Sequence, residues 1–366
     1  MITIAKPYVG SEEIKAVSGV LKSGMLAQGP KVKELEETFP IFCDGKYAIA
    51  VNSGTAALHT ALNVIGIKQE NEVITTPFTF IATANTILMQ KAKPVFVDVD
   101  EDTFNINPDK IREKITKKTK AIVTVDLYGQ LCDYDKINEI AENNKLIVVE
   151  DACQSINAEY KGKKAGGLGD IACFSFYATK NITCGEGGMI VANDKEHAEN
   201  AKLFRQHGRS DISEYDYLGV GYNYRMTDIS AAILLEQLKK LNFITEKRIE
   251  NAEYLSKGLR KIKGIKVPVV KEGNKHVFHQ YTIKVENNFK LKRNELIRHL
   301  NKKGIGCNVY YPRPLHLCQH IKKFGYKEGD FPVAEKLSKQ VISLPIHPHL
   351  TKGQLDYMIK VFGELE

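Results

Sequence analysis

Short apolar segments alternate with segments of helical period through the first two-thirds of the chain. Several apolar segments, such as residues 122–125 and 146–149, have no polar face, which is typical of strands covered on both sides. The expected strands are 47–51, 72–76, 94–99, 121–127, 146–150, 171–177 and 189–191. This alternation predicts an α/β fold with a mostly parallel sheet between helices.

The helical segments lie between and after these strands. In the first part of the chain they cover residues 56–65, 107–115, 134–143 and 197–205. From residue 228 the pattern changes, and residues 229–241, continued to about 259, predict a long helix that bridges into a second region. That region has expected strands at 278–285 and 307–311 and expected helices at 293–303 and 332–340. We therefore expect a large domain, residues 1–245, and a smaller α+β domain, residues 246–366.

Charge excludes one class of partner. The 366 residues include 52 Lys and Arg against 44 Asp and Glu, a net charge of +8. The basic residues are interspersed, and the longest cluster is only Lys117, Lys118 and Lys120. We therefore expect no nucleic-acid partner, and the excess suits small anionic ligands better.

Cysteine and histidine spacing does not indicate a disulfide framework or a metal site. The seven cysteines are odd in number and at least eleven residues apart, without a CxxC pair. The pairs His276/His279 and His347/His349 have ligand-like spacing, but no HExxH pattern or acidic partner completes a site. We expect free thiols, no bound metal, and an ordinary strand at 276–281.

No membrane segment is expected. The N-terminus lacks the long apolar core of a signal peptide. Residues 48–67 and 73–90 carry no formal charge over about the length of a membrane span. Both are interrupted by polar residues, Gly or Pro, so a buried strand followed by a helix explains each better. We therefore expect a cytoplasmic protein.

Two strand ends carry residues suited to cofactor chemistry. Asp151 follows the apolar strand 146–150, where a carboxylate is costly unless it holds a cation. A helix cap is the simpler explanation for Asp151 alone. Lys180 follows the strand 171–177 beside the glycine-rich turn 185–188 and is a candidate Schiff-base lysine. Taken alone, it is more simply a solvated surface lysine.

A third strand end offers a place for an anion. Strand 47–51 is followed by Ser53, Gly54 and Thr55, a tight turn that opens a helix. Backbone N–H groups in such a turn bind an anion or form an ordinary cap. Together, the three strand ends match the needs of pyridoxal phosphate (PLP). Its aldehyde bonds to a lysine, its pyridinium nitrogen pairs with an Asp, and its phosphate binds at a helix N-terminus. Phe80 offers a flat surface for the ring or packs in the core.

Four segments resemble the signatures of the DegT/StrS-type sugar-nucleotide aminotransferases, which are fold type I PLP enzymes. They are SGTAAL at 53–58, EDACQS at 150–155, FSFYATKN at 174–181 and GYNYRM at 221–226. They occur in family order, and the resemblance runs from Pro7 to about Leu350. It implies a large domain with a mixed, mostly parallel seven-stranded sheet and a smaller C-terminal domain.

The resemblance also implies roles at the cofactor. Lys180 forms the Schiff base with PLP and moves protons, and Asp151 pairs with the pyridinium nitrogen. Gln154 lies at the ring hydroxyl, and Phe80 stacks on the ring, where many relatives carry Trp or Tyr. Asn223 reaches over from the partner subunit of a homodimer with shared active sites. The residues implied to hold the phosphate are Gly54, Thr55, Ala56 and Ser175.

The activity implied is transfer of an amino group from L-glutamate, leaving 2-oxoglutarate, to a nucleoside-diphosphate keto-sugar by a ping-pong mechanism. Lys180 favours transamination, because dehydratases of the family carry His at this position. The turn GEGG at 185–188 resembles members that aminate C4 of 4-keto-6-deoxy sugars. The alternatives are a 3-keto sugar aminotransferase, a PLP-dependent sugar dehydratase and a PLP-binding regulator. The candidate substrate residues are Arg225, Tyr311, Arg313 and His316; for either arginine, an ion pair is an equal explanation.

Overall fold

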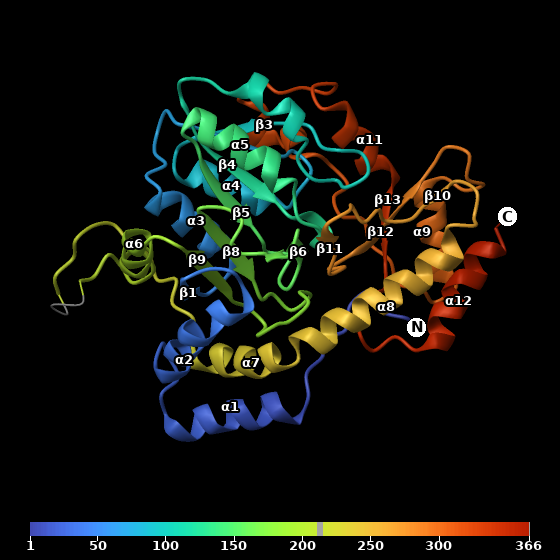
Figure 1. Ribbon diagram of the computed structural model, residues 1–366. Helices are drawn as coiled ribbons and strands as arrows, with labels where there is room; N and C mark the ends of the chain where they lie inside the picture. The colour runs from blue at the N-terminus through green and yellow to red at the C-terminus, as the bar shows by residue number, and fades with distance from the viewer. Residues whose placement is uncertain (211–214, 366) are drawn as a thin grey trace.

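The computed structural model describes residues 1–210 and 215–365. Its centre is a seven-stranded sheet with the strand order β1-β9-β8-β5-β4-β2-β3 (Figure 1). The strands are β1 (Tyr47–Val51), β2 (Glu72–Thr75), β3 (Lys93–Phe96), β4 (Thr119–Val125), β5 (Ile147–Asp151), β8 (Ile171–Ser175) and β9 (Gly188–Ala192). Strand β9 pairs antiparallel with β1 and β8, and the other pairs are parallel. The predicted mixed, mostly parallel sheet is confirmed.

Helices cover both faces of this sheet (Figure 1). One face packs against α3 (Gly54–Val64), α4 (Ile81–Met89) and α6 (Lys195–Arg205). The other packs against α2 (Pro30–Thr38), α5 (Tyr134–Asn144) and α7 (Asp228–Lys239), with α1 (Ser11–Ser23) lying along α7. Because both faces are covered, the strands are apolar on both sides, as their sequences predict.

Strand β5 shows how the alternation of side chains positions the site. Val149 belongs to the buried cluster shared with α3, and Val148 to the cluster shared with α5. Since successive side chains point to opposite faces, Asp151 faces the α3 and α4 side and Glu150 faces the other. The register pairs Asp151 with Cys173 of β8. The carboxyl ends of these parallel strands therefore meet at one edge of the sheet.

The C-terminal part adds one small sheet and several helices, and it contributes one strand to a second small sheet. Strands β10 (Ile265–Lys266), β12 (Tyr281–Val285) and β13 (Val341–Leu344) form one sheet, and β11 (Asn274–Lys275), β6 (Glu159–Tyr160) and β7 (Lys163–Lys164) form the other. The helices are α8 (Leu241–Leu259), α9 (Arg293–Lys302), α10 (Gln319–Lys322), α11 (Pro332–Gln340) and α12 (Lys352–Gly363). Short 3-10 helices are η1 (Phe39–Phe42), η2 (Pro108–Lys110), η3 (Arg112–Lys114), η4 (Leu127–Gly129) and η5 (Leu315–Leu317).

The predicted domain boundary near residue 245 falls inside α8. Beyond it, Leu255, Ile283 and Met358 belong to a separate buried cluster. Leu315 and Leu337, although C-terminal in sequence, pack instead with Phe78 beside the central sheet. The division into domains at residue 245 stays a prediction.

Four predicted elements differ from the observed ones, three of them as follows. The helix predicted at 107–115 is two 3-10 turns, η2 and η3, since the Asn107 side chain accepts the Asp109 N–H and forms a local turn instead. The helix predicted to run from 229 to 259 is divided at Lys240 into α7 and α8. The strand predicted at 307–311 is wrong, because only Asn308 pairs there, in a single bridge to Ser343.

The strand predicted from residue 276 or 278 begins later, at Tyr281. Phe278 has φ +45° and therefore cannot continue an extended strand. Its ring stacks on His276 with 4.0 Å between centroids. Residues 276–280 therefore form a bent connection between β11 and β12, which matters for the site described below.

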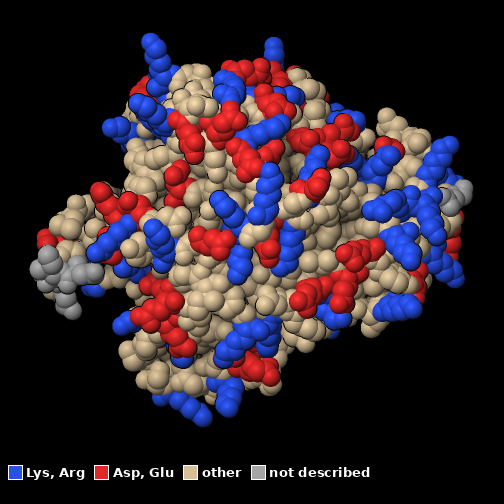
Figure 2. Space-filling model, viewed as in Figure 1, with Lys and Arg blue, Asp and Glu red and all other residues tan. Residues whose placement is uncertain are grey.

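The positive charge is unevenly distributed. Residues 246–366 carry 24 Lys and Arg against 12 Asp and Glu, whereas residues 1–245 carry 28 against 32. Figure 2 shows basic side chains gathered over the C-terminal part, around the end of α8 and β10. The excess of basic residues, from which we expect small anionic ligands, therefore lies mainly away from the central sheet. No helix in residues 1–210 or 215–365 is long and apolar enough to cross a membrane.

Candidate active site

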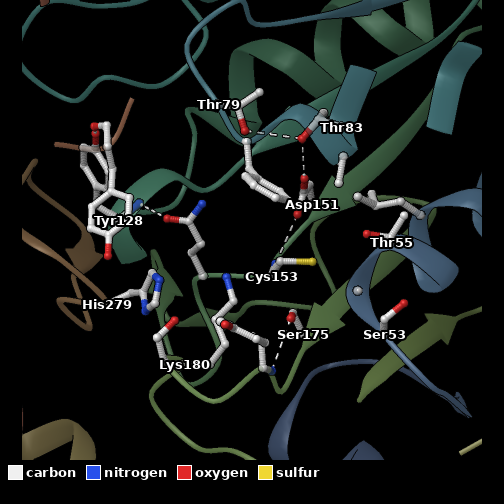
Figure 3. A pocket seen from close by; sticks show the side chains of 18 of the residues that line it. Ser53, Thr55, Thr79, Thr83, Tyr128, Asp151, Cys153, Ser175, Lys180 and His279 are labelled. Carbon is white, nitrogen blue, oxygen red and sulfur yellow. Dashed lines mark hydrogen bonds between the residues drawn. The ribbon is translucent and has the colours of Figure 1, made fainter. Parts of the chain in front are cut away.

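A cavity of about 500 Å³ opens at the carboxyl edge of the central sheet (Figure 3). It is lined by one lysine and two acids, Lys180, Asp151 and Glu186, among mostly uncharged residues. The predicted site residues that line it are Gly54, Thr55, Phe80, Asp151, Gln154, Ser175, Lys180 and Tyr311. The tertiary structure thus brings together strand ends more than 100 residues apart in sequence.

The predicted phosphate turn joins β1 to α3. Ser53 caps the helix, its Oγ accepting the N–H of Ala56 at 3.1 Å. A methyl group on Gly54 would lie 2.8 Å from Cβ of Ser175, so only glycine allows this approach. The N-terminus of α3 and the Ser175 hydroxyl therefore face the same corner of the cavity, which suits an anion.

Asp151 is buried at the end of β5. Its Oδ2 accepts the Thr83 hydroxyl at 2.9 Å and its Oδ1 accepts the Cys153 N–H at 3.3 Å. Burial raises the pKa of Asp151, and the hydrogen bonds from Cys153 and Thr83 and the charge of Lys180 oppose that rise. A buried carboxylate held in this way is completed by a cationic partner within the cavity.

Lys180 lies in the turn after β8, and its backbone N–H donates to the Tyr177 carbonyl at 2.9 Å. Burial lowers the pKa of its amine, while the nearby Cys153 and Asp151 act in the opposite direction. A larger share of this amine is therefore neutral near pH 7 than for a solvated lysine. A neutral amine serves both as nucleophile and as base.

Gln154 is oriented by its neighbours. Its Oε1 accepts the Tyr128 N–H at 3.0 Å, and its Nε2 donates to the Tyr311 hydroxyl at 3.3 Å. Phe80 stands at the mouth, 56% exposed, with its ring centroid 6.4 Å from that of Tyr311. An exposed aromatic ring beside the cavity is consistent with stacking on a planar group.

Five predicted site residues do not line the cavity. Ala56 is buried in the first turn of α3, and its N–H is already bound by Ser53. His316 is fully buried and lies 3.0 Å from Oε1 of Glu335, so it faces a carboxylate rather than the cavity. The others are Asn223 and Arg313, both exposed, and Arg225, which is half-buried in a bridge to Val51.

Several lining residues were missed from the sequence. Thr83 supports Asp151 from α4, and Tyr128, His279 and Tyr310 form the wall opposite the phosphate turn. Their positions depend on long-range packing, and a lone Thr, Tyr or His carries no local signature. The spacing of His276 and His279 indicates at most a metal-binding pattern and not a place in this wall. In the described residues, no group of three His, Cys, Asp or Glu is arranged to hold a metal ion.

The donor set fits PLP. Among the described residues, the buried carboxylate of Asp151 accepts no hydrogen bond from a lysine or arginine, and a pyridinium nitrogen would supply the cation. Gly54 and Ser175 shape a close, N–H-lined corner for the phosphate. Lys180 lines the same cavity and lies to the left of Asp151 and Ser175 in Figure 3.

Comparison with known protein families agrees with this site. The model of the DegT/DnrJ/EryC1/StrS aminotransferase family matches residues 7–362. The spore coat polysaccharide biosynthesis protein SpsC of Bacillus subtilis is 40% identical, with 98% of this chain and 95% of SpsC covered. The GDP-perosamine synthase of Caulobacter vibrioides is 36% identical over 100% of this chain and 98% of the relative. A UDP-2-acetamido-2-deoxy-3-oxo-D-glucuronate aminotransferase of Pseudomonas aeruginosa is 37% identical over 93% and 92%.

Solved structures agree in fold over the whole chain. DesV of S. venezuelae, solved in complex with a ketimine intermediate, has a TM-score of 0.92 at 35% identity, with 97% of this chain and 94% of that chain covered. The sugar aminotransferase Spr1654 of Streptococcus pneumoniae, in its PMP form, has a TM-score of 0.95 at 30% identity over 100% and 97%.

Proposed function

We propose, since the chain belongs to the DegT/DnrJ/EryC1/StrS aminotransferase family, that it transfers the amino group of L-glutamate to a nucleoside-diphosphate 4-keto-6-deoxy sugar. The protein is a sugar aminotransferase of fold type I, and its cofactor is PLP. The observation that carries the proposal is the placement of Lys180, Asp151 and the Ser53–Gly54–Thr55 turn around one cavity.

Each group of the chain has a distinct task. When bound, PLP supplies a carbonyl carbon that carries the amino group and a ring that accepts an electron pair. Hydrogen bonds from Thr83 and Cys153 favour the carboxylate form of Asp151, which would hold the protonated ring nitrogen. The N-terminus of α3 and Ser175 would hold the phosphate. Gln154, whose Oε1 accepts the Tyr128 N–H, would lie at the ring hydroxyl.

Lys180 moves the proton. Its amine would take the proton from Cα of the amino donor and, from the same face, deliver it to the former carbonyl carbon of the cofactor, which requires a neutral amine. Burial favours the neutral form by lowering the pKa of Lys180. The donor and the keto-sugar use one cavity, so 2-oxoglutarate leaves before the sugar enters, and the kinetics are ping-pong. Lysine at this position also weighs against the dehydratase alternative.

The site is completed by a second copy of the chain in this proposal. Asn223 and Arg225 do not line the cavity of their own chain. Between them and residue 215, the large apolar side chains Tyr217, Leu218 and Val220 are each more than half exposed. An exposed apolar segment of this kind is typical of an interface. We therefore propose a homodimer in which Asn223 of each copy contributes to the cavity of the other.

The position of amination has two candidates. The turn at 185–188 places Glu186 on the cavity wall, and the resemblance of this turn favours a 4-keto sugar. The 37% identical relative from P. aeruginosa is named for a 3-oxo substrate, so a 3-keto sugar is the second candidate. Tyr311 lines the cavity and stays a proposed substrate residue, and Arg313 lies outside it.

We place the reaction in the cytoplasm, where the seven free thiols would stay reduced.

A spectrum and a substrate screen test the proposal. The PLP-loaded protein should absorb in the visible, glutamate should convert the cofactor to its amine form, and Lys180→Ala should remove the visible band. UDP-, dTDP- and GDP-linked 4-keto and 3-keto sugars are then offered to the glutamate-treated enzyme, and products are scored by mass. No conversion with glutamate would reject the donor. Amination of 3-keto sugars alone would reject the C4 assignment. Light scattering that shows an active monomer would reject the shared site.

A further inference from the structure

Two polar groups in the cavity wall lack hydrogen-bond partners in the described part of the chain. Nδ1 of His279 is buried and unpartnered. The amine of Lys180, which lines the same cavity, makes no hydrogen bond to residues 1–210 or 215–365. The two side chains lie beside one another in Figure 3. The charge of Lys180 also acts on the His279 ring, so the two groups are close enough to interact electrostatically.

The His279 ring is neutral. Its burial and the charges of Lys180 and Arg248 hold its pKa well below the usual value of a histidine. Arg248 on α8 is buried, and its Nη1 donates to the carbonyls of Phe278 and His279 at 3.1 and 3.4 Å. Among the described residues it has no acidic ion-pair partner. The charge of Arg248, which no described acidic side chain neutralises, lies against the bent connection 276–280 and therefore opposes protonation of His279.

The neutral ring has one N–H, and its neighbours decide which nitrogen carries it. Nε2 of His279 lies 3.5 Å from Nε2 of Gln280, an amide nitrogen that only donates. Nε2 of the ring is therefore the acceptor, and Nδ1 carries the hydrogen. A buried N–H without a partner is costly, so a group that reaches Nδ1 during the reaction relieves that cost.

The backbone around His279 is rigid. The Val277 N–H donates to the Gly129 carbonyl at 2.9 Å, and the Gln280 N–H donates to the Tyr128 carbonyl at 3.2 Å. A methyl group on Gly129, which has φ +104°, would lie 3.0 Å from the backbone nitrogen of His279. The positive φ of Phe278 is maintained by these contacts. The ring is thus presented from a fixed backbone, whereas the Lys180 side chain has four rotatable bonds.

We propose that His279 is a positioning residue for Lys180: when the lysine is not bonded to the cofactor, its amine accepts a hydrogen bond from Nδ1–H of His279. This bond selects the neutral amine, because a protonated amine has no lone pair to accept it. It also holds the amine near the reacting carbon between proton transfers. The proposal rests on the proposed proton-carrying role of Lys180.

The charges around Lys180 come from several elements, and all are retained in the test. The titratable groups that line or adjoin its part of the cavity are Asp151, Cys153, Tyr177, Glu186, Tyr128, Tyr310 and Tyr311, with Lys6, Tyr8 and Arg248 on its other side. Asp151 and Cys153 raise the pKa of Lys180. Because these groups are unchanged in the His279 variants, a difference between variants reports the contribution of His279.

The test measures the pKa of Lys180 directly. Protein loaded with pyridoxamine phosphate leaves the lysine free, and competitive acetylation across pH, read by mass spectrometry, reports its titration. His279→Leu should raise the pKa of Lys180 by about one unit, a tenfold loss of neutral amine at a given pH. His279→Asn, whose amide replaces Nδ1–H, should restore most of the shift. With glutamate, His279→Leu should lower kcat about tenfold and leave KM nearly unchanged.

His276→Leu is the matched control, because His276 lies on the same bent connection and its Nδ1 accepts the Phe278 N–H at 3.0 Å. It should leave the pKa of Lys180 unchanged. If His279→Leu does not fold, His279→Gln, whose amide reaches the Nε2 position, replaces it and should also raise the pKa. An unchanged Lys180 titration in the folded His279 variants would overturn the proposal, even if kcat fell. Since acetylation requires no turnover, failure of the glutamate reaction alone would overturn the proposed function instead.

Discussion

Oγ1 of Thr83 donates a 2.9 Å hydrogen bond to Oδ2 of Asp151 and links the first turn of α4 to the end of β5. Burial alone would favour a protonated carboxyl at this position. The hydrogen bond favours the carboxylate, which is the form that can pair with a cationic ring nitrogen. Thr83 is therefore part of the proposed cofactor site although it lies 68 residues from Asp151 in sequence.

Thr83→Val keeps the shape of the side chain and removes this donor. We expect kcat to fall about 10- to 100-fold, because a hydrogen bond to a charged group contributes about 1.5–3 kcal/mol. The pKa of Asp151 should rise, so the acid limb of the pH–rate profile should move to higher pH. Thr86→Val is the control, because among the described residues the buried Thr86 hydroxyl bonds only to the Thr83 carbonyl. An equal loss of kcat in both variants would contradict the role of Thr83.

Gly54→Ala tests the close approach at the phosphate turn. The added methyl group would lie 2.8 Å from Cβ of Ser175 and 3.0 Å from Sγ of Cys153, so the start of α3 must move away from Ser175. We expect PLP to bind at least tenfold more weakly, measured by fluorescence titration. Gly19→Ala in α1 has open space around the new methyl group and should stabilise the protein by roughly 0.5–1 kcal/mol. Unchanged PLP affinity in Gly54→Ala would show that the approach is not required.

The buried ion pair between Arg205 and Glu36 connects α6 to α2. Nη1 of Arg205 donates to Oε1 of Glu36 and, at 2.8 Å, to the Ala50 carbonyl. Glu36→Ala leaves the arginine charge buried and should lower the free energy of unfolding by about 3–5 kcal/mol. Glu34→Ala breaks an exposed pair with Lys31 and should cost less than about 1 kcal/mol. Urea denaturation at pH 7 measures both, and similar midpoints for the two variants would refute the distinction.

Asp126 makes stability depend on pH. It is fully buried, accepts the Cys132 N–H at 3.0 Å and the Ser155 hydroxyl at 3.2 Å, and burial raises its pKa to about 7. The unfolded value is about 3.9. Between these values the folded chain binds a proton that the unfolded chain lacks, so this group's contribution to stability falls as pH rises from about 4 to 7.

Asp126→Asn removes that titration. Relative to the wild type, the variant should gain stability as pH rises from 4.5 to 8, measured by urea midpoints across the range. Asp109→Asn, at an exposed residue paired with Lys136, should show no such gain. A constant difference between Asp126→Asn and the wild type at every pH would exclude a raised pKa for Asp126.

Much of the fold follows from local pattern. The strands at the centre of the sheet lie within a few residues of their predicted bounds, because burial on both faces requires uninterrupted apolar residues. The exceptions have specific causes. Asn107 forms a side-chain turn in place of a helix, and Phe278 takes a positive φ in place of an extended strand. In both, a contact outside the periodic pattern determined the backbone.

The sequence alone determined the sheet, the cofactor chemistry, and the residues that end its strands, because Asp151, Lys180 and the Ser53–Gly54 turn directly follow apolar strands. Only the tertiary structure decided which other side chains meet them. It placed Thr83 on Asp151, directed His316 toward Glu335 and away from the cavity, and set His279 beside Lys180. Strand ends converge because parallel strands share an edge, which is a property of the local pattern. Contacts between side chains far apart in sequence depend on packing and register, which no local pattern contains.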